Sequence, residues 1–280
     1  LKMFKDYLQL VRIPGIFTAL SNVLIGYFFS FSETEVISFP FLLLTSGMLF
    51  CSGMIFNDYF DLQIDKKERP DRPLPSKKIS KQNAFLLGVI FLILANFFAF
   101  VVGYHSLIIS LIMTVLIIVY NYKLKFISFL GIFNLSFIRF LNVLLGFSLL
   151  SITFDIIQYA IPIGIFVGGI SILAKNESGL ITPVSKKLNC IFILITICYV
   201  SVLLINNFQI ESLIFLGLFS TMQLYVLFEK KIKNQITFQL LSIILLDATL
   251  ISILASFYAS ILVSFLIIPA YFIAKKFYLT

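Results

Sequence analysis

Charged residues are scarce in this sequence. Only 12% of its 280 residues are Asp, Glu, Lys or Arg, whereas 60% are hydrophobic, and the mean hydropathy is +1.06. A soluble domain of this size cannot bury so large an apolar fraction, because even large folds leave much of their chain in water. The composition therefore excludes an ordinary soluble protein and predicts that lipid surrounds most of the chain.

Tryptophan is absent and cysteine is rare. The three cysteines, Cys51, Cys190 and Cys198, all lie in apolar runs. Their spacing matches neither a metal site nor an extracellular disulfide framework, so we interpret them as small hydrophobic residues. No Gly/Ser-rich linker and no clear tandem repeat divides the chain. We therefore expect a single membrane-embedded domain over residues 1–280.

Long apolar runs recur along the chain, and a helix needs about 20 apolar residues to cross the hydrocarbon core. The runs that fit one crossing are Ile13–Phe31, Phe39–Phe56, Ala84–Val102, Ser106–Asn121, Phe129–Leu150, Ile156–Ala174, Asn189–Ile205 and Ser212–Phe228. The last run, Phe238–Ala274, is too long for one crossing at about 1.5 Å per residue. It is predicted to turn near Ser256–Ser260, or else to form one long tilted helix. The fold class is therefore all-α, a transmembrane bundle of nine to ten helices.

The connecting segments alternate in charge. Lys and Arg occur in every second connection, starting with the N-terminal segment, whereas the intervening connections carry acids such as Glu33 and Asp155 and no Lys or Arg. By the positive-inside rule, the N-terminus and the basic connections are expected in the cytoplasm, with the protein in a bacterial inner (plasma) membrane. The net charge of +8 then reflects topology and anionic lipid headgroups. Because the basic residues are spread over five connections and lack a binding fold, no nucleic-acid partner is expected.

An acidic stripe follows the second apolar run. It extends from Asn57 to Asp65 as NDYFDLQID. Asp58, Asp61 and Asp65 are three and four residues apart, so on a continuing helix they share one face, which Asn57 joins. Adjacent carboxylates repel one another unless a positive group lies between them, and Mg²⁺ combines carboxylate oxygens with phosphate oxygens. The stripe therefore predicts a Mg²⁺ site at the membrane surface.

A basic, proline-rich segment comes next, with the sequence RPDRPLPS over residues 69–76. Its prolines stop the helix and are expected to keep Arg69 and Arg72 close to the acidic stripe. Arginine suits bidentate contact with phosphate. Carboxylates for a metal beside arginines for phosphate favour a lipid-linked diphosphate as the ligand. The alternative interpretation is an ordinary solvated charged loop.

The acidic stripe and the Arg-Pro segment together resemble the first signature of the UbiA superfamily of intramembrane prenyltransferases. Three further stretches agree with it: LVR at 10–12 before the first span, YNYKLK at 120–125 after the fourth, and Arg139 with Asn142 and Gly146 on the fifth. The resemblance covers roughly residues 7–180, and the C-terminal third only by hydropathy.

The resemblance implies helices around a central cavity and the Mg²⁺-dependent transfer of a prenyl group. The donor would be a polyprenyl diphosphate, and the acceptor an aromatic or other hydrophobic, lipid-accessible molecule that reaches the site among the membrane lipids. By the same resemblance, Asn57, Asp58, Asp61 and Asp65 would hold the metal and the diphosphate. The residues expected to bind substrate or to line the reaction centre are Arg12, Arg69, Arg72, Tyr120, Lys125, Arg139 and Asn142, of which Tyr120 and Lys125 join Asp58 and Asp61 as catalytic candidates.

The second acidic motif of that family, Asp-x-x-x-Asp after the sixth helix, is reduced here. The matching stretch, residues 171–179, contains Glu177 and no aspartate. We expect either that Glu177 completes the metal site or that Lys175 takes the place of a second metal. Asp247, an isolated acid within an apolar run, is either functional or a hydrogen-bonded structural residue.

The reduced motif leaves other functions open. One alternative is a non-catalytic relative that binds or moves an isoprenoid-like lipid. A phosphatase of lipid diphosphates is a further one. A secondary transporter is disfavoured, because transporters place their ionisable residues near the bilayer midplane, whereas the main charged cluster here lies at one interface.

Overall fold

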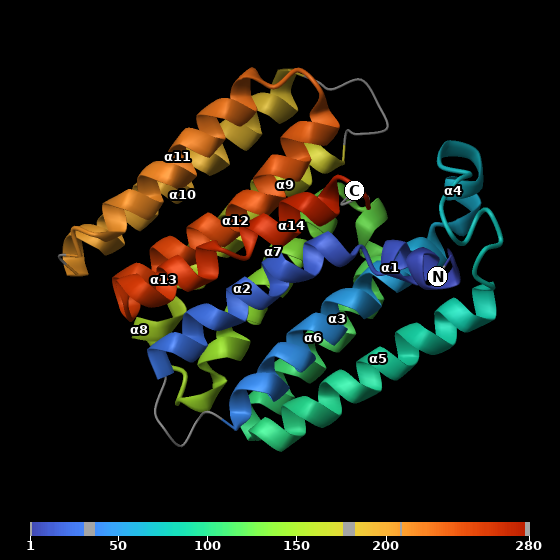
Figure 1. The fold of residues 1–280 in the computed structure, drawn as a ribbon, viewed down its shortest axis with the longest axis horizontal. Coiled ribbons are helices and arrows are strands. Elements are labelled where there is room, and N and C mark those ends of the chain that lie inside the picture. The colour runs from blue at the N-terminus through green and yellow to red at the C-terminus, as the bar shows by residue number, and fades with distance from the viewer. Residues whose placement is uncertain (1, 31–36, 176–182, 208, 278–280) are drawn as a thin grey trace.

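The computed structural model describes residues 2–30, 37–175, 183–207 and 209–277. Their secondary structure is helical throughout (Figure 1). The first half contains α1 (Lys2–Leu10), α2 (Ile13–Ser30), α3 (Ser38–Phe60), α4 (Leu62–Glu68), α5 (Lys81–Val102), α6 (Tyr104–Tyr122), the 3-10 turn η2 (Leu124–Phe126) and α7 (Ser128–Gly146). The second half contains the 3-10 turn η3 (Phe147–Leu149), α8 (Phe154–Ile157), α9 (Ile161–Ala174), α10 (Pro183–Asn207), α11 (Ser212–Phe228), α12 (Ile232–Leu254), α13 (Phe257–Ser264) and α14 (Ile267–Ala274).

The helices confirm the predicted membrane bundle. Within the described residues, nine helical segments are long and apolar enough to cross a membrane, and α11 is a shorter apolar helix. The long last run turns as predicted, because α12 ends at Leu254 and Ser256 caps α13 by accepting a hydrogen bond from Tyr258 N at 3.2 Å. The following helix, α13, packs back against α12. The protein is therefore an integral membrane protein.

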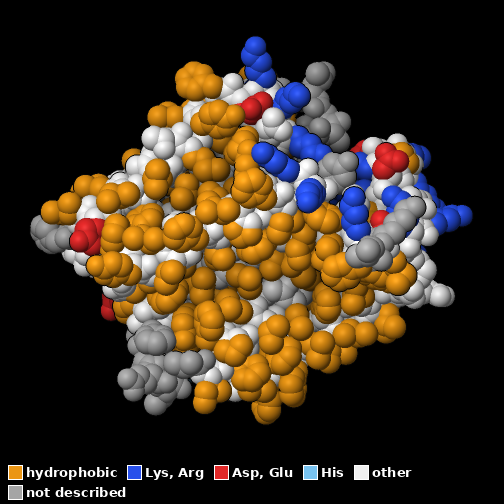
Figure 2. All heavy atoms as spheres, viewed as in Figure 1, with side chains coloured by type: hydrophobic (Ala, Val, Ile, Leu, Met, Phe, Trp, Pro, Cys, Tyr) orange, Lys and Arg blue, Asp and Glu red, His pale blue; other side chains and the backbone are white. Residues whose placement is uncertain are grey.

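Figure 1 shows how the helices are arranged. The α10–α11 pair lies along one side of the bundle, α3, α5 and α6 lie along the other, and α2, α7 and α12 lie between them. The N-terminus, α4 and the C-terminus gather at one end. Figure 2 shows that Lys and Arg side chains cluster at this end while apolar side chains cover most of the rest of the face. We call it the basic end.

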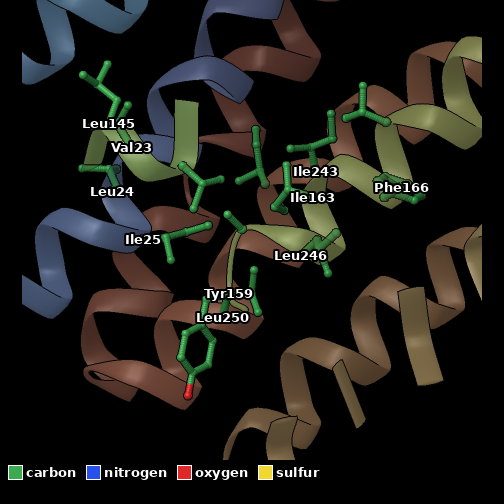
Figure 3. Close-up of a cluster of buried hydrophobic side chains, with 14 of the residues drawn as sticks. Val23, Leu24, Ile25, Leu145, Tyr159, Ile163, Phe166, Ile243, Leu246 and Leu250 are labelled. Carbon is green, nitrogen blue, oxygen red and sulfur yellow. The ribbon is translucent and has the colours of Figure 1, made fainter. Parts of the chain in front are cut away.

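The core is centred on α12. In the most apolar 18-residue stretch of α12, 83% of the residues are buried, whereas the share is 22% in α5 and 22% in the α13–α14 segment. The latter two therefore face lipid. Figure 3 shows apolar side chains from α2, α7, α9 and α12 converging, with Ile25, Leu145, Ile163 and Leu246 among them. Burial inside a membrane protein gains from close packing of such side chains, since lipid is as apolar as they are.

Two glycines allow α2 and α7 to approach closely at the far end from the basic residues. A Cβ atom added at Gly146 would lie 2.1 Å from Val23 O, and one added at Gly26 would lie 2.2 Å from Phe147 N. No side chain fits at these distances. The crossing fixes the angle between α2 and α7, which carry residues of the cavity described next.

Candidate functional site

A cavity opens at the basic end between α2, α3, α6, α7, α9 and α12. Its volume is about 380 Å³, and its lining is largely apolar, with Leu49, Phe50 and Ile138 among the residues. Arg and Lys side chains also line it, but no Asp or Glu of the described residues does. These lining cations are Arg12, Arg69, Lys125, Arg139 and Lys175. The wall of the cavity is therefore mostly apolar, with basic side chains at its mouth and Arg139 deeper among the apolar residues.

The acidic stripe lies beside this mouth, across a break between two helices. Helix α3 ends at Phe60 and α4 begins at Leu62, yet Asp61 N still bonds Asn57 O at 3.0 Å and Asp65 N bonds Asp61 O at 2.8 Å. The helical spacing therefore survives the break. Asp58 and Asp65 are both buried, each 2% exposed, and buried carboxylates need charged or hydrogen-bonding partners.

Arg72 supplies those partners for both buried carboxylates. Its Nη1 lies 3.2 Å from Asp58 Oδ1 and 2.9 Å from Asp65 Oδ2. Arg69 is more distant, with Nη1 3.9 Å from Asp65 Oδ1, and it lines the cavity instead. The two arginines of the Arg-Pro segment thus have different positions: Arg72 lies behind the wall and Arg69 lies in it.

Arg12 joins the stripe from the other side. Its Nη2 donates to Asp58 Oδ1 at 3.0 Å and to Asn57 Oδ1 at 3.3 Å. Its backbone adopts a left-handed conformation with φ of 49° between α1 and α2, a region that non-glycine residues occupy only when their surroundings hold them there. Burial lowers the pKa of Arg12, Asp58 opposes that shift, and Arg72 adds to it. An arginine remains charged despite such a shift.

The helix α6 and the turn η2 each contribute a side chain to the site, Tyr120 and Lys125 respectively. Lys125 Nζ lies 2.6 Å from Asp61 Oδ1, so Asp61, which is one fifth exposed, has a cation of its own. The turn η2 that carries Lys125 lies directly on Gly131 of α7, where an added Cβ would meet Leu124 O at 2.9 Å. Tyr120 lines the cavity one turn earlier.

Two asparagines that were not expected from the sequence, Asn121 and Asn22, hold residues of the cavity wall in place. Asn121 Oδ1 accepts a hydrogen bond from Asn57 Nδ2 at 3.3 Å and thereby joins α6 to the acidic stripe. Deeper in the cavity, Arg139 donates from Nη1 to Asn22 Oδ1 at 3.3 Å and from Nη2 to Thr18 Oγ1 at 3.2 Å. Thr18 and Asn22 lie in an apolar run, where an isolated Thr or Asn gives no signal of its contacts.

Asp247 and Asn142 also have defined partners. Asn22 Nδ2 lies 2.9 Å from both carboxylate oxygens of Asp247, which is fully buried. Asn142 accepts from Ser46 Oγ and donates to Ala19 O, both at 2.8 Å. Asp247 is therefore hydrogen-bonded within the structure, and it lines neither the mouth nor the interior of the cavity.

Lys175 lies at the C-terminus of α9 and lines the cavity mouth. Glu177, which the sequence analysis placed in the metal site, falls outside the described residues. The structure thus gathers Arg12, Asn57, Lys125 and Lys175 around one opening, together with Arg69, and sets Arg139 and Asn142 below them.

The carboxylate oxygens beside the mouth are of the chemical type that binds Mg²⁺. Among the described residues, no group of three His, Cys, Asp or Glu side chains converges as a metal cluster. Mg²⁺, however, is commonly bound through one or two carboxylates, with waters and substrate phosphates filling the remaining positions. Asp58 and Asp61, one helical turn apart, are hard oxygen donors of the required type.

The profile of the UbiA prenyltransferase family matches residues 19–280. A digeranylgeranylglyceryl phosphate synthase from Sulfurisphaera tokodaii is 33% identical over 35% of this chain and 38% of its own length. A protein of the same name from Saccharolobus solfataricus is 31% identical over 45% of each chain. The matched region thus spans less than half the length of these relatives.

Solved structures show the same fold. A structure of digeranylgeranylglyceryl phosphate synthase has a TM-score of 0.67 and 21% identity, over 91% of this chain and 99% of its own. A UbiA homologue from Archaeoglobus fulgidus bound to GPP and Mg²⁺ has a TM-score of 0.67 and 16% identity, over 89% of this chain and 99% of its own. The fold class and the helical arrangement predicted from the sequence are thereby confirmed.

Proposed function

Because the chain belongs to the UbiA prenyltransferase family, we propose that it transfers a prenyl group from a polyprenyl diphosphate to a lipid-accessible acceptor, with Mg²⁺ as cofactor. The layout of the cavity carries this proposal. A positive mouth backed by three carboxylates suits a diphosphate and a divalent cation, and the apolar interior suits a prenyl chain. The positive-inside rule favours a cytoplasmic location for this mouth.

The residues at the mouth would stabilise the leaving group. Arg12, Arg69 and Lys125 would bind diphosphate oxygens and offset the charge that grows there as the allylic C–O bond breaks. Asp58 and Asp61, with Asn57, would hold Mg²⁺, which when bound would supply further neutralisation of the diphosphate. Arg72 and Asp65 would position the stripe from behind, since Arg72 contacts Asp58 and Asp65 together.

The inner wall would protect the allylic cation that develops. Aromatic faces stabilise a nearby cation, and both Phe50 and Tyr120 line the cavity. The apolar lining keeps water from the reacting carbon. The acceptor oxygen would then form the new bond to that carbon, and its proton would leave with the released diphosphate.

A glycerol phosphate ether lipid is the acceptor that we propose first. The relatives from Sulfurisphaera and Saccharolobus carry the name digeranylgeranylglyceryl phosphate synthase. That product contains two prenyl ethers on one glycerol phosphate, so its final step is the addition of a prenyl group to a monoether. The membrane itself delivers such an acceptor to a cavity between helices.

The direct test supplies labelled geranylgeranyl diphosphate, Mg²⁺ and geranylgeranylglyceryl phosphate to the purified protein in nanodiscs. We expect Mg²⁺-dependent release of diphosphate and formation of the diether. Asp61→Asn should abolish both. Asp155→Asn is the matched control, because Asp155 is exposed in α8, at the end opposite α4, and its loss should leave the rate unchanged. Equal rates for the wild type and Asp61→Asn would refute the assigned site.

A second function, binding of an isoprenoid lipid without turnover, is favoured by one observation. The carboxylates of Asp58, Asp61 and Asp65 all have basic partners within the protein, so the site is electrostatically satisfied without a metal. In that case the labelled donor would bind to the protein in nanodiscs with or without Mg²⁺, and neither the glycerol phosphate acceptor nor an added aromatic acceptor would give a product.

A further inference from the structure

A polar cluster lies deep in the cavity, away from the mouth. Arg139 is eleven residues into α7 from Ser128, which is about 16 Å along the helix. Thr18 is six residues beyond Arg12, about 9 Å deeper along α2. Both line the cavity. The cluster therefore lies deeper along the cavity than the backbone of Arg12.

The Arg139 guanidinium is held in place by two helices. Asn22 and Thr18 of α2 each accept one of its hydrogen bonds, and its centre lies 5.4 Å from the ring centroid of Phe50 on α3. Asn22 is itself fixed by Asp247 of α12, whose two oxygens are both 2.9 Å from Asn22 Nδ2. A guanidinium carries five N–H donors, so the two bonds to Asn22 and Thr18 leave donors for a ligand in the cavity.

The balance of charge around Arg139 differs from that at the mouth. Arg139 and Asp247 carry opposite formal charges and face each other through Asn22. Among the described residues, the four lining cations of the mouth and the ion pairs beside and behind it bring five cations against three carboxylates: Arg12, Arg69, Arg72, Lys125 and Lys175 against Asp58, Asp61 and Asp65. An anion is therefore favoured at the mouth. At Arg139 the nearby carboxylate already balances the cation, and a further charge in an apolar span is expensive.

We propose that Arg139 forms an acceptor subsite that binds an uncharged oxygen of the acceptor's polar end, such as a hydroxyl or ether oxygen. Asn22 and Asp247 are positioning residues that hold the guanidinium toward the cavity. The inference rests on the proposed function, because it concerns the second substrate of that reaction. It assigns the phosphate of a glycerol phosphate acceptor to the mouth and its glycerol or ether oxygen to Arg139.

The energetic consequence is selectivity for an oxygen-bearing end. Acceptors that carry such an oxygen satisfy the remaining N–H donors of Arg139, whereas a plain hydrocarbon leaves them unpaired. A hydrogen bond to a charged group corresponds to about a 10- to 100-fold change in affinity. The diphosphate, bound elsewhere, should not be affected by this contact.

The test measures binding, not turnover, with labelled geranylgeranylglycerol, geranylgeranylglyceryl phosphate and Mg²⁺ diphosphate as separate probes on the full chain in nanodiscs. Arg139→Met should weaken binding of both lipids about 10- to 100-fold and leave diphosphate binding unchanged, which also reports that the variant is folded. Arg139→Lys, which keeps the charge but loses the planar set of donors, should give a smaller loss. Asp247→Asn should give a loss in the same direction.

The matched control is Asn96→Leu. Asn96 makes comparable intramembrane bonds, to Thr114 Oγ1 at 2.9 Å and from Ser110 Oγ at 3.0 Å, but it does not line the cavity. It should leave all three probes unaffected. A purely structural role for Arg139 would instead weaken diphosphate binding together with lipid binding.

Three results would overturn the inference. The first is unchanged binding of geranylgeranylglycerol to Arg139→Met. The second is a loss confined to the phosphate-bearing lipid, which would make Arg139 an anion site. The third is a wild type that binds diphosphate and neither lipid, which would also remove the proposed acceptor class. Arg139-dependent lipid binding without any transfer would support the subsite and count against the proposed reaction alone.

Discussion

Replacing Arg72 by methionine tests whether the acidic stripe is held together by buried ion pairs. The side chains of Asp58 and Asp65 are 3% and 2% exposed, and that of Arg72 is 11% exposed. Removing one partner of a buried pair leaves an uncompensated charge and typically costs about 3–5 kcal/mol. In the variant, Asp58 would still have its ion pair with Arg12 at 3.0 Å, and Asp65 would still have the more distant one with Arg69 at 3.9 Å. We therefore expect Arg72→Met to lower the free energy of unfolding by about 3 kcal/mol, the lower limit of that range.

The assay is reversible unfolding in mixed detergent micelles, followed by circular dichroism. A loss of about 3 kcal/mol raises the unfolding equilibrium constant about 100-fold. The control is the double variant Arg72→Met with Asp65→Asn, which removes both charges of the shorter of the two ion pairs that Arg72 makes. Because the orphaned carboxylate is then neutral, the double variant should be more stable than Arg72→Met alone. Additive losses, or a loss below about 1 kcal/mol for Arg72→Met, would show that these pairs are not effectively buried.

Two further substitutions test the helix packing and the helix capping. Gly146→Ala should destabilise the fold by about 3 kcal/mol, the upper end of the range for overpacking, because its Cβ would lie 2.1 Å from Val23 O. The control is Gly217→Ala in α11, where an added Cβ would meet nothing within 4 Å; it should be neutral or stabilising by up to about 1 kcal/mol. The same unfolding assay measures both variants. Ser80→Ala should lower the free energy of unfolding by about 1 kcal/mol, because Ser80 Oγ accepts a hydrogen bond from Asn83 N at 3.1 Å at the start of α5. We expect faster amide hydrogen exchange confined to the first turn of α5. Unchanged exchange there would argue against the cap.

The sequence predicted the parts of this site whose cause is local. The three- and four-residue spacing of the acidic stripe survives in the backbone bonds from Asp61 to Asn57 and from Asp65 to Asp61. The apolar runs predicted the spans because helix length must match bilayer thickness. The turn before α13 was also predictable, since the final run exceeds one crossing.

The contacts between distant segments were not predictable from one sequence. Asn22 and Asp247 are 225 residues apart, and each looks like an isolated polar residue in an apolar run. The path of the Arg-Pro segment decides that Arg72 lies behind the wall while Arg69 lines it, and proline spacing does not specify that path. The close crossing of α2 and α7 at Gly26 and Gly146 likewise depends on two helices that meet only in the folded bundle.

The central claim is that the carboxylates and cations at the basic end bind a diphosphate together with Mg²⁺. It is tested most directly by the affinity of the purified protein for geranyl thiodiphosphate, a slowly reacting donor analogue, measured with and without Mg²⁺. We expect much tighter binding with Mg²⁺ than without it for the wild type, and loss of that difference in Asp61→Asn. Equal affinity with and without Mg²⁺ in the wild type would contradict it.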